Sequence, residues 1–150
     1  MTPIDLDEIE ERAVDSPSPW ARKHVEQYLE SGGEAVEHPM DDRLILLYVT
    51  GRRSGEIRRV PVVHFADGDD MLIVASKGGA PEDPEWFRNL AADPRVWVRF
   101  RDDFFEARAE VLTPEERASA WGMLTSIAPS FADYQAKVER TIPVVRLSRA

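Results

Sequence analysis

The residues best suited to chemistry are cationic and lie in two glycine-bounded stretches of the chain. The first stretch, TGRRSGEIRRVP, places Arg52, Arg53, Arg58 and Arg59 within eight residues, although the whole chain carries a formal charge of −9. Guanidinium groups bind phosphate and carboxylate through paired hydrogen bonds. The cluster therefore indicates an anion site, and the alternative is a solvated surface whose arginines pair with neighbouring carboxylates.

The second stretch is the sequence Ser76-Lys77-Gly78-Gly79, which follows an expected strand. Glycine allows the backbone to turn its N–H groups toward an anion. The alternative is a flexible loop that carries a solvated lysine. If this loop and the arginine cluster lie on the same side of the fold, they form one anion cradle. Trp86 on the next helix could then pack against a planar ligand, although a core position is the commoner one for tryptophan.

Several other chemistries are excluded or disfavoured by the sequence. The chain has no cysteine, which excludes disulfides, thiolate catalysis and cysteine-ligated metals. The motifs GxSxG, HExxH, GxGxxG and GxxxxGK[ST] are all missing, so a serine hydrolase and the usual dinucleotide and P-loop sites are not expected. The histidines, His24, His38 and His64, share no ligand spacing, and we predict no metal site. His64 is expected to line a barrel wall or pocket.

Composition bounds the class of protein. A chain of 150 residues with 43% hydrophobic and 31% charged residues is typical of one globular domain, here residues 1–150. The net charge of −9 argues against a nucleic-acid partner. The acidic N-terminus lacks the apolar core of a signal peptide, and no apolar run is long enough to span a membrane. We expect a cytoplasmic protein without membrane insertion, and leave peripheral membrane association open.

Local patterns predict six strands with helices between and around them. The expected strands are residues 44–50, 57–66, 71–76, 96–100, 104–112 and 142–147. The expected helices begin at Pro19, at Pro84 with Asp83 as cap, after the capping box at Thr113, and after Ser130. Residues 4–14 are a weak helix or a frayed terminus, so residues 1–17 are expected to be a loosely packed segment. In the helix from Pro19, Trp20, His24 or Val25, Tyr28 and Leu29 share an apolar face.

This order of elements predicts an α+β fold with a small, mostly antiparallel barrel. Strands in hairpin order pair with their neighbours, and closing the sheet removes its exposed edges. Helices do not alternate regularly with the strands, which argues against a doubly wound parallel sheet.

Three segments in the same order and spacing carry a resemblance to a known family. TGRRSGEIRRVP, VASKGGAPEDPEWFRNLAADPRV and ADYQAKVERTIPVVRL resemble the deazaflavin (F420)-dependent nitroreductase and quinone reductase family. With WARKHVEQYLESGGE, the resemblance covers residues 19 to 147. It implies a split β-barrel of the FMN-binding-like type and an oxidoreductase. Such an enzyme passes hydride from reduced F420, a cofactor with a phosphate and a polyglutamate tail, to a quinone or nitroaromatic acceptor.

The resemblance also implies roles for individual residues. Arg52, Arg53, Ser54 and Arg58 match the segment that binds the cofactor tail, and Ser76 with Lys77 match the phosphate-binding loop. Gly78, Gly79 and Ala80 match backbone positions near the phosphate and the ring. Trp86 and Asn89 match the helix that lines the pocket.

The chain departs from nitroreducing relatives in the segment APSFADYQ. Those relatives carry tyrosines where this chain has Ala128 and Phe131, while Tyr134 is kept. We take Tyr134 as the candidate catalytic hydroxyl, and nitroreductase activity is in doubt. The missing hydroxyls also leave open a non-catalytic F420 or flavin carrier, and a split barrel that uses FMN or haem is a third option. The oligomeric state stays open, with a monomer as the working expectation.

Overall fold

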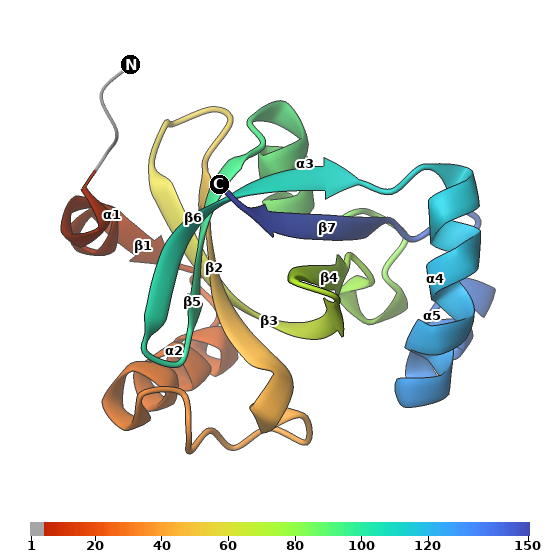
Figure 1. The fold of residues 1–150 in the computed structure, drawn as a ribbon, viewed down its shortest axis with the longest axis horizontal. Coiled ribbons are helices and arrows are strands. Elements are labelled where there is room, and N and C mark those ends of the chain that lie inside the picture. The colour runs from red at the N-terminus through yellow and green to blue at the C-terminus, as the bar shows by residue number, and fades with distance from the viewer. Residues whose placement is uncertain (1–4) are drawn as a thin grey trace.

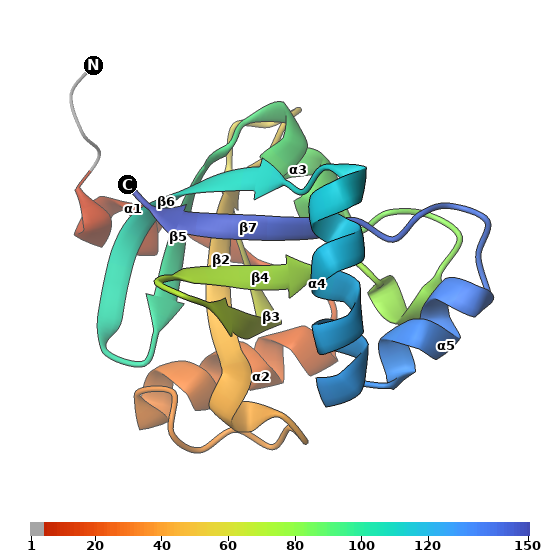
Figure 2. The same cartoon turned by 45° about the vertical axis from the view of Figure 1, so that its right-hand side comes forward.

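The computed structural model describes residues 5–150, which form one mixed sheet surrounded by helices (Figures 1 and 2). The strands are β1 (Ala13–Asp15), β2 (Leu44–Thr50), β3 (Ile57–Asp67), β4 (Asp70–Val74), β5 (Arg95–Phe100), β6 (Asp103–Val111) and β7 (Val144–Arg149). The helices are α1 (Leu6–Arg12), α2 (Pro19–Ser31), α3 (Glu85–Ala92), α4 (Pro114–Ile127) and α5 (Ser130–Ala136). Short 3-10 turns lie at Asp41–Arg43 and Lys77–Gly79.

The strands β2 to β7 close into a six-stranded antiparallel barrel. The sheet order is β1-β3-β2-β5-β6-β7-β4, and the additional pairing of β3 with β4 joins the two ends of the six-strand run. Outside this closed run, β1 pairs in parallel with β3. The prediction of an α+β split barrel is confirmed, and the five long strands β2, β3, β5, β6 and β7 begin and end within about two residues of the predicted bounds.

The strand β2 is buried on both of its faces. Ile45, Leu47 and Val49 point into the barrel, where they pack with side chains of β4 to β7. On the other face, Leu46 and Tyr48 belong to a second cluster that includes residues of α1 and α2. This double burial explains why the strand reads as an unbroken apolar run rather than as an alternating one.

Most helix ends form as the sequence predicts, and three details are wrong. Ser18 caps α2, which ends at Gly32 with φ +65°, and the capping box at Thr113 is present. Asp83 does not cap α3, because its carboxylate pairs with Arg140 and Pro84 precedes the helix. Ser130 is the first residue of α5 rather than its cap.

The apolar face predicted for α2 is also only half right. His24, Val25 and Tyr28 are buried, but Trp20 is 61% exposed and Leu29 is 39% exposed. None of the helices within residues 5–150 is long and apolar enough to cross a membrane.

The part of the N-terminal segment that the structure describes makes defined contacts with the barrel. Ile9 is fully buried, and β1 aligns Ala13 with Ile57 and Asp15 with Arg59. The predicted helix began at residue 4, which lies outside the described residues.

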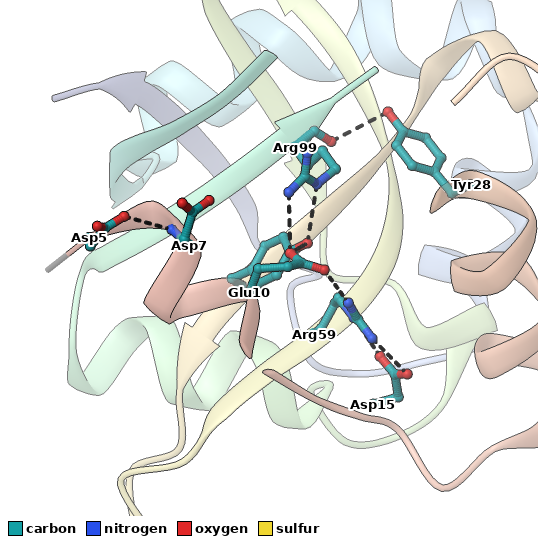
Figure 3. A network of polar contacts seen from close by, with 8 residues as sticks. Asp5, Asp7, Glu10, Asp15, Tyr28, Arg59 and Arg99 are labelled. Carbon is teal, nitrogen blue, oxygen red and sulfur yellow. Dashed lines mark hydrogen bonds and ion pairs between the residues drawn. The ribbon is translucent and has the colours of Figure 1, made fainter. Parts of the chain in front are cut away.

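An ion-pair network centred on Arg59 holds this segment (Figure 3). Arg59 donates to both carboxylate oxygens of Asp15 at 2.6 and 2.9 Å and to Glu10 at 2.5 Å. The other oxygen of Glu10 accepts from the Tyr48 hydroxyl and from Arg99. Burial alone would lower the pKa of Arg59, but the hydrogen bond and charge of Asp15 and the charge of Glu10 raise it. Burial and the bond to Glu10 raise the pKa of Tyr48 to about 12, so its hydroxyl stays protonated.

We expect Arg59→Gln to lower the free energy of unfolding by about 3 kcal/mol, because it leaves the half-buried carboxylate of Asp15 without its cation and removes one of the two cations that pair with Glu10. Urea unfolding measures the change. The matched control is Arg12→Gln, which removes an exposed pair with Glu8 at 3.8 Å and should cost less than about 0.5 kcal/mol. Equal losses in the two variants would contradict a structural role for the Arg59 network.

Candidate functional site

A trough of three adjoining cavities runs along one side of the barrel. The helix cavity reaches α2 and α5 and has a volume of about 350 Å³. The central cavity lies next to it and has a volume of about 480 Å³. The tip cavity lies at the β2–β3 turn and has a volume of about 270 Å³. Lys77 and Trp86 line both the helix and central cavities. Arg58, Glu85 and Asn89 line both the central and tip cavities. These shared lining residues show that the three cavities adjoin one another.

The tip cavity brings together the arginine segment and α3. The Arg52 backbone N–H and its Nη1 both donate to Asn89 Oδ1, at 3.1 and 2.9 Å, and Nη1 also pairs with Glu85 at 2.8 Å. Asn89 is buried, so it fixes the position of the turn against the helix. Arg53 and Ser54 lie exposed on the wall of the same cavity. The predicted tail-binding residues are therefore neighbours in the structure.

Charge in this part of the trough is mixed but predominantly positive. Arg58 pairs with Glu56 at 3.1 Å, and the hydrogen bond from Arg52 lowers the pKa of Glu85. Of the four clustered arginines, Arg59 lines the central cavity but commits its guanidinium to Asp15 and Glu10. Three arginines of the cluster thus line the tip cavity, two of them paired there with glutamates, and the fourth anchors the N-terminal segment.

The loop from Ser76 to Gly79 has the backbone shape of an anion-binding nest. Ser76 is in the right-handed helical region, and Lys77, Gly78 and Gly79 follow with φ of +47°, +62° and +83°. A right-handed residue followed by a left-handed one turns successive N–H groups to the same side. A Cβ on Gly79 would lie 3.2 Å from Tyr134 Cα, so glycine allows α5 to pack against the loop.

The predicted residues of this loop do not all reach the trough. Ser76, Lys77 and Gly78 line the helix cavity, and Lys77 also lines the central one. Gly79 and Ala80 line none of the three cavities. Gly79 packs on Tyr134, and the Ala80 carbonyl accepts from Arg140 at 3.1 Å. These two residues shape the loop rather than face the trough.

Arg140 is the residue that the sequence analysis missed. Its guanidinium donates to the carbonyls of Ala75, Ser76 and Ala80 at 3.0 to 3.3 Å and to Asp83 at 2.7 Å. Its side chain is only 15% exposed. One side chain therefore holds the loop from both ends. Arg140 is not part of an arginine cluster in the sequence, so no local pattern distinguishes it from a surface arginine.

The helix cavity is largely apolar and has two different walls. Val62, Val63 and Val74 contribute strand side chains, and Ala128, Phe131 and Tyr134 lie on the α4–α5 side. Trp20 and His24 from α2 and His38 from the following connection complete the lining. The sequence analysis placed Trp20 and His24 on a core-facing stripe, where helical spacing alone does not show that a cavity lies beside them.

Comparisons with known proteins agree with this geometry. A family model described as F420H(2)-dependent quinone reductase matches residues 20–148. An F420H(2)-dependent quinone reductase of Mycobacterium tuberculosis H37Rv is 32% identical over 145 residues, which cover 88% of this chain and 97% of the relative.

Two solved structures are similar at 36% identity. One, described as an F420-H2 dependent reductase (FDR-A), has a TM-score of 0.65 and covers 71% of this chain and 94% of its own. The other, described as a domain-swapped dimer, has a TM-score of 0.68 and covers 89% of this chain and 100% of its own. A haem storage protein from Vibrio cholerae, HutZ, at 12% identity and a TM-score of 0.54, shares the fold alone.

We expect Arg140→Gln to loosen the loop and to lower the free energy of unfolding by about 2 kcal/mol, because several buried carbonyls lose a charged donor. Hydrogen exchange of residues 75–83 should become faster than in the parent protein. Arg149→Gln is the control, since its pair with Asp103 is exposed and distant from the loop. Unchanged exchange in the Arg140 variant would show that the loop holds its shape without this residue.

Proposed function

The chain belongs to the F420H(2)-dependent quinone reductase family, and we propose that it transfers hydride from reduced F420 to a quinone or a similar electron-poor acceptor. The observation that carries this proposal is the order of chemistries along the trough. A cationic tip, a backbone nest with a lysine, and an apolar cavity follow one another. A polyanionic tail, a phosphate and a planar ring require the same three environments in the same order.

The residues present fit such a cofactor. Arg52, Arg53, Ser54 and Arg58 would hold the tail, and Lys77 with the N–H groups of the nest would hold the phosphate. Trp86 and Asn89 would form the wall beside it, while Gly79 and Ala80 set the shape of the loop. FMN is a less suitable ligand, because it has a single phosphate and no anionic tail that the arginines at the tip could bind. The bound cofactor supplies the hydride, and the protein supplies position and electrostatics.

The helix cavity is the place proposed for the acceptor, which would lie there beside the planar ring of the cofactor. Its valine and phenylalanine side chains offer an apolar wall to a planar quinone. Tyr134 is the proposed catalytic hydroxyl, because it lines this cavity and can donate to an acceptor oxygen as negative charge develops there. Ala128 and Phe131 offer no hydroxyl, so we propose quinones as the first acceptor class and nitroaromatics as the second.

Cellular placement and assembly remain predictions. We expect a cytoplasmic monomer, and light scattering coupled to size-exclusion chromatography measures the assembly directly. The similar structure described as a domain-swapped dimer makes a dimer the alternative outcome.

Titration of F420 with the purified protein should change the cofactor's fluorescence, and addition of menadione should then oxidise the reduced cofactor. Lys77→Ala should raise the Kd for F420 about 10- to 100-fold, because it removes a charge-assisted hydrogen bond to the phosphate. Lys23→Ala is the matched control, since Lys23 makes an exposed pair with Glu37 at 3.0 Å. Absence of F420 binding by the parent protein would refute the proposal, and binding without turnover of any acceptor would favour the carrier function.

Tyr134→Phe should lower kcat for menadione about tenfold, because one hydrogen bond to the developing oxyanion is lost. The Kd for F420 should stay unchanged, since the substitution keeps the Cα and Cβ atoms that pack beside Gly79. Stopped-flow oxidation of the reduced cofactor measures the rate. A parent-like rate would remove Tyr134 from the reaction.

A further inference from the structure

His24 on α2 carries a polar atom whose purpose the fold does not explain. The side chain is only 5% exposed, and its Nε2 lies 3.1 Å from the Glu37 carbonyl oxygen. A carbonyl can only accept, so Nε2 carries the proton in this contact. The second ring nitrogen, Nδ1, is buried and has no hydrogen-bond partner among the described residues. Buried polar atoms are nearly always paired, so an unpaired one requires an explanation.

The surroundings of His24 place this imidazole at the helix cavity. Trp20, His24 and His38 all line that cavity. The Trp20 ring packs edgewise against His24 with the centroids 4.3 Å apart, and the His38 ring follows at 5.4 Å. Trp20 is 61% exposed, so little packing opposes rotation of its side chain. A ligand that displaces this ring would reach the imidazole from the cavity.

Quinone reduction needs a proton as well as a hydride, and the helix cavity offers few groups that can supply it. Its titratable lining residues are His24, His38, Lys77 and Tyr134, and no carboxylate lines it within residues 5–150. Imidazole is the side chain best suited to exchange protons near neutral pH. The choice of proton donor therefore lies first between the two histidines.

The two histidines differ in what their nitrogens already do. The Nδ1 atom of His38 accepts from the Met40 backbone N–H at 3.0 Å. Burial, together with the charge of His24, lowers the pKa of His38, which favours its neutral form. Of the two histidines, only His24 has a buried ring nitrogen without a hydrogen-bond partner among the described residues.

We propose that His24 is a further acceptor-binding residue, whose Nδ1 hydrogen-bonds an acceptor oxygen and, as imidazolium, gives it a proton. This inference rests on the proposed function, since it assigns a role in the same reaction. Two electrons and one hydrogen nucleus reach the quinone as hydride. The N–H bond at Nδ1 breaks, and an O–H bond forms on the quinone oxygen, which completes the hydroquinone. Nδ1 regains a proton from solvent, into which oxidation of the cofactor releases one.

Several charged or titratable groups surround His24. From α2 and the following connection, these are His38, the ion pair between Lys23 and Glu37, and Asp41, which faces His38. From the other side of the cavity, they are Lys77 and Tyr134. Because only the protonated imidazole donates from Nδ1, kcat/KM for the quinone should decrease as the pH is raised.

Two substitutions separate the two ring nitrogens. Glutamine places a donor near the position of Nε2, so His24→Gln keeps the contact to Glu37 and loses Nδ1. Asparagine places a polar atom near the position of Nδ1, so His24→Asn keeps a hydrogen bond to the acceptor without a titrating proton. The control is His64→Asn, because His64 is equally buried, contacts the Arg43 carbonyl through Nδ1 at 2.6 Å and lies outside the helix cavity.

The first measurement needs no cofactor. Menadione should quench the tryptophan fluorescence of the cofactor-free protein, and Trp20→Phe should remove that part of the signal which Trp20 contributes. His24→Gln should raise the midpoint of this quenching about tenfold, in keeping with the loss of one hydrogen bond. His64→Asn should leave the midpoint unchanged.

The second measurement is steady-state kinetics with F420H2 and menadione. His24→Gln should lower kcat/KM for menadione about 10- to 100-fold and flatten its pH profile, with the Kd for F420 unchanged. His24→Asn should restore KM but not kcat, and its pH profile should also be flat. Circular dichroism and the F420 titration confirm that each variant is folded.

A His24→Gln or His24→Asn protein with the parent's quenching midpoint, kcat and pH profile would overturn the inference. Failure of the proposed function would look different, since the parent protein itself would then fail to oxidise F420H2 with any quinone.

Discussion

The site depends on one guanidinium group that ties the ends of a strained loop together. Lys77 holds a left-handed conformation, which costs a residue with a side chain about 1–2 kcal/mol. The loop has few bonds of its own, chiefly from Gly79 to Ser76 and from Ala80 to Lys77. The contacts of Arg140 offset the strain by fixing carbonyls on both sides of it. Without the hydrogen bonds from Arg140, few interactions would stabilise the shape of the nest in the absence of a ligand.

Closure of the barrel puts that guanidinium in position. The strand β7 pairs with β4, and the Ala75 N–H donates to Pro143 just before β7 begins. The chain segment that carries Arg140 is therefore fixed beside the end of β4. Because the same pairing removes the sheet's open edges, the loop of Ser76 to Gly79 takes its position as the barrel closes. This explains how a segment near the C-terminus shapes a loop more than sixty residues earlier in the chain.

Sequence patterns correctly predicted the features that depend on neighbouring residues in the chain. Strand bounds, the Thr113 capping box and the stop of α2 at Gly32 depend on residues a few positions apart. Two of the missed features depend on distant partners. Asp83 pairs with Arg140 instead of capping α3, and Arg59 pairs with Asp15 instead of facing an anion. The family resemblance supplied the residues of the trough, but no pattern in the sequence could divide four similar arginines into three that face it and one that anchors a strand.

The pairing of Arg59 with two carboxylates helps to keep the trough cationic on an acidic protein. Arg59 satisfies Glu10 and Asp15, carboxylates that would otherwise lie beside the central cavity and repel an anion. Asn89, a neutral residue, positions Arg52 through its amide oxygen, while Glu85 remains largely exposed to solvent. The negative charge near the trough is thus paired in the N-terminal network, or it lies on exposed glutamates that pair with arginines at the tip. The local potential can therefore stay positive on a chain whose formal charge is −9.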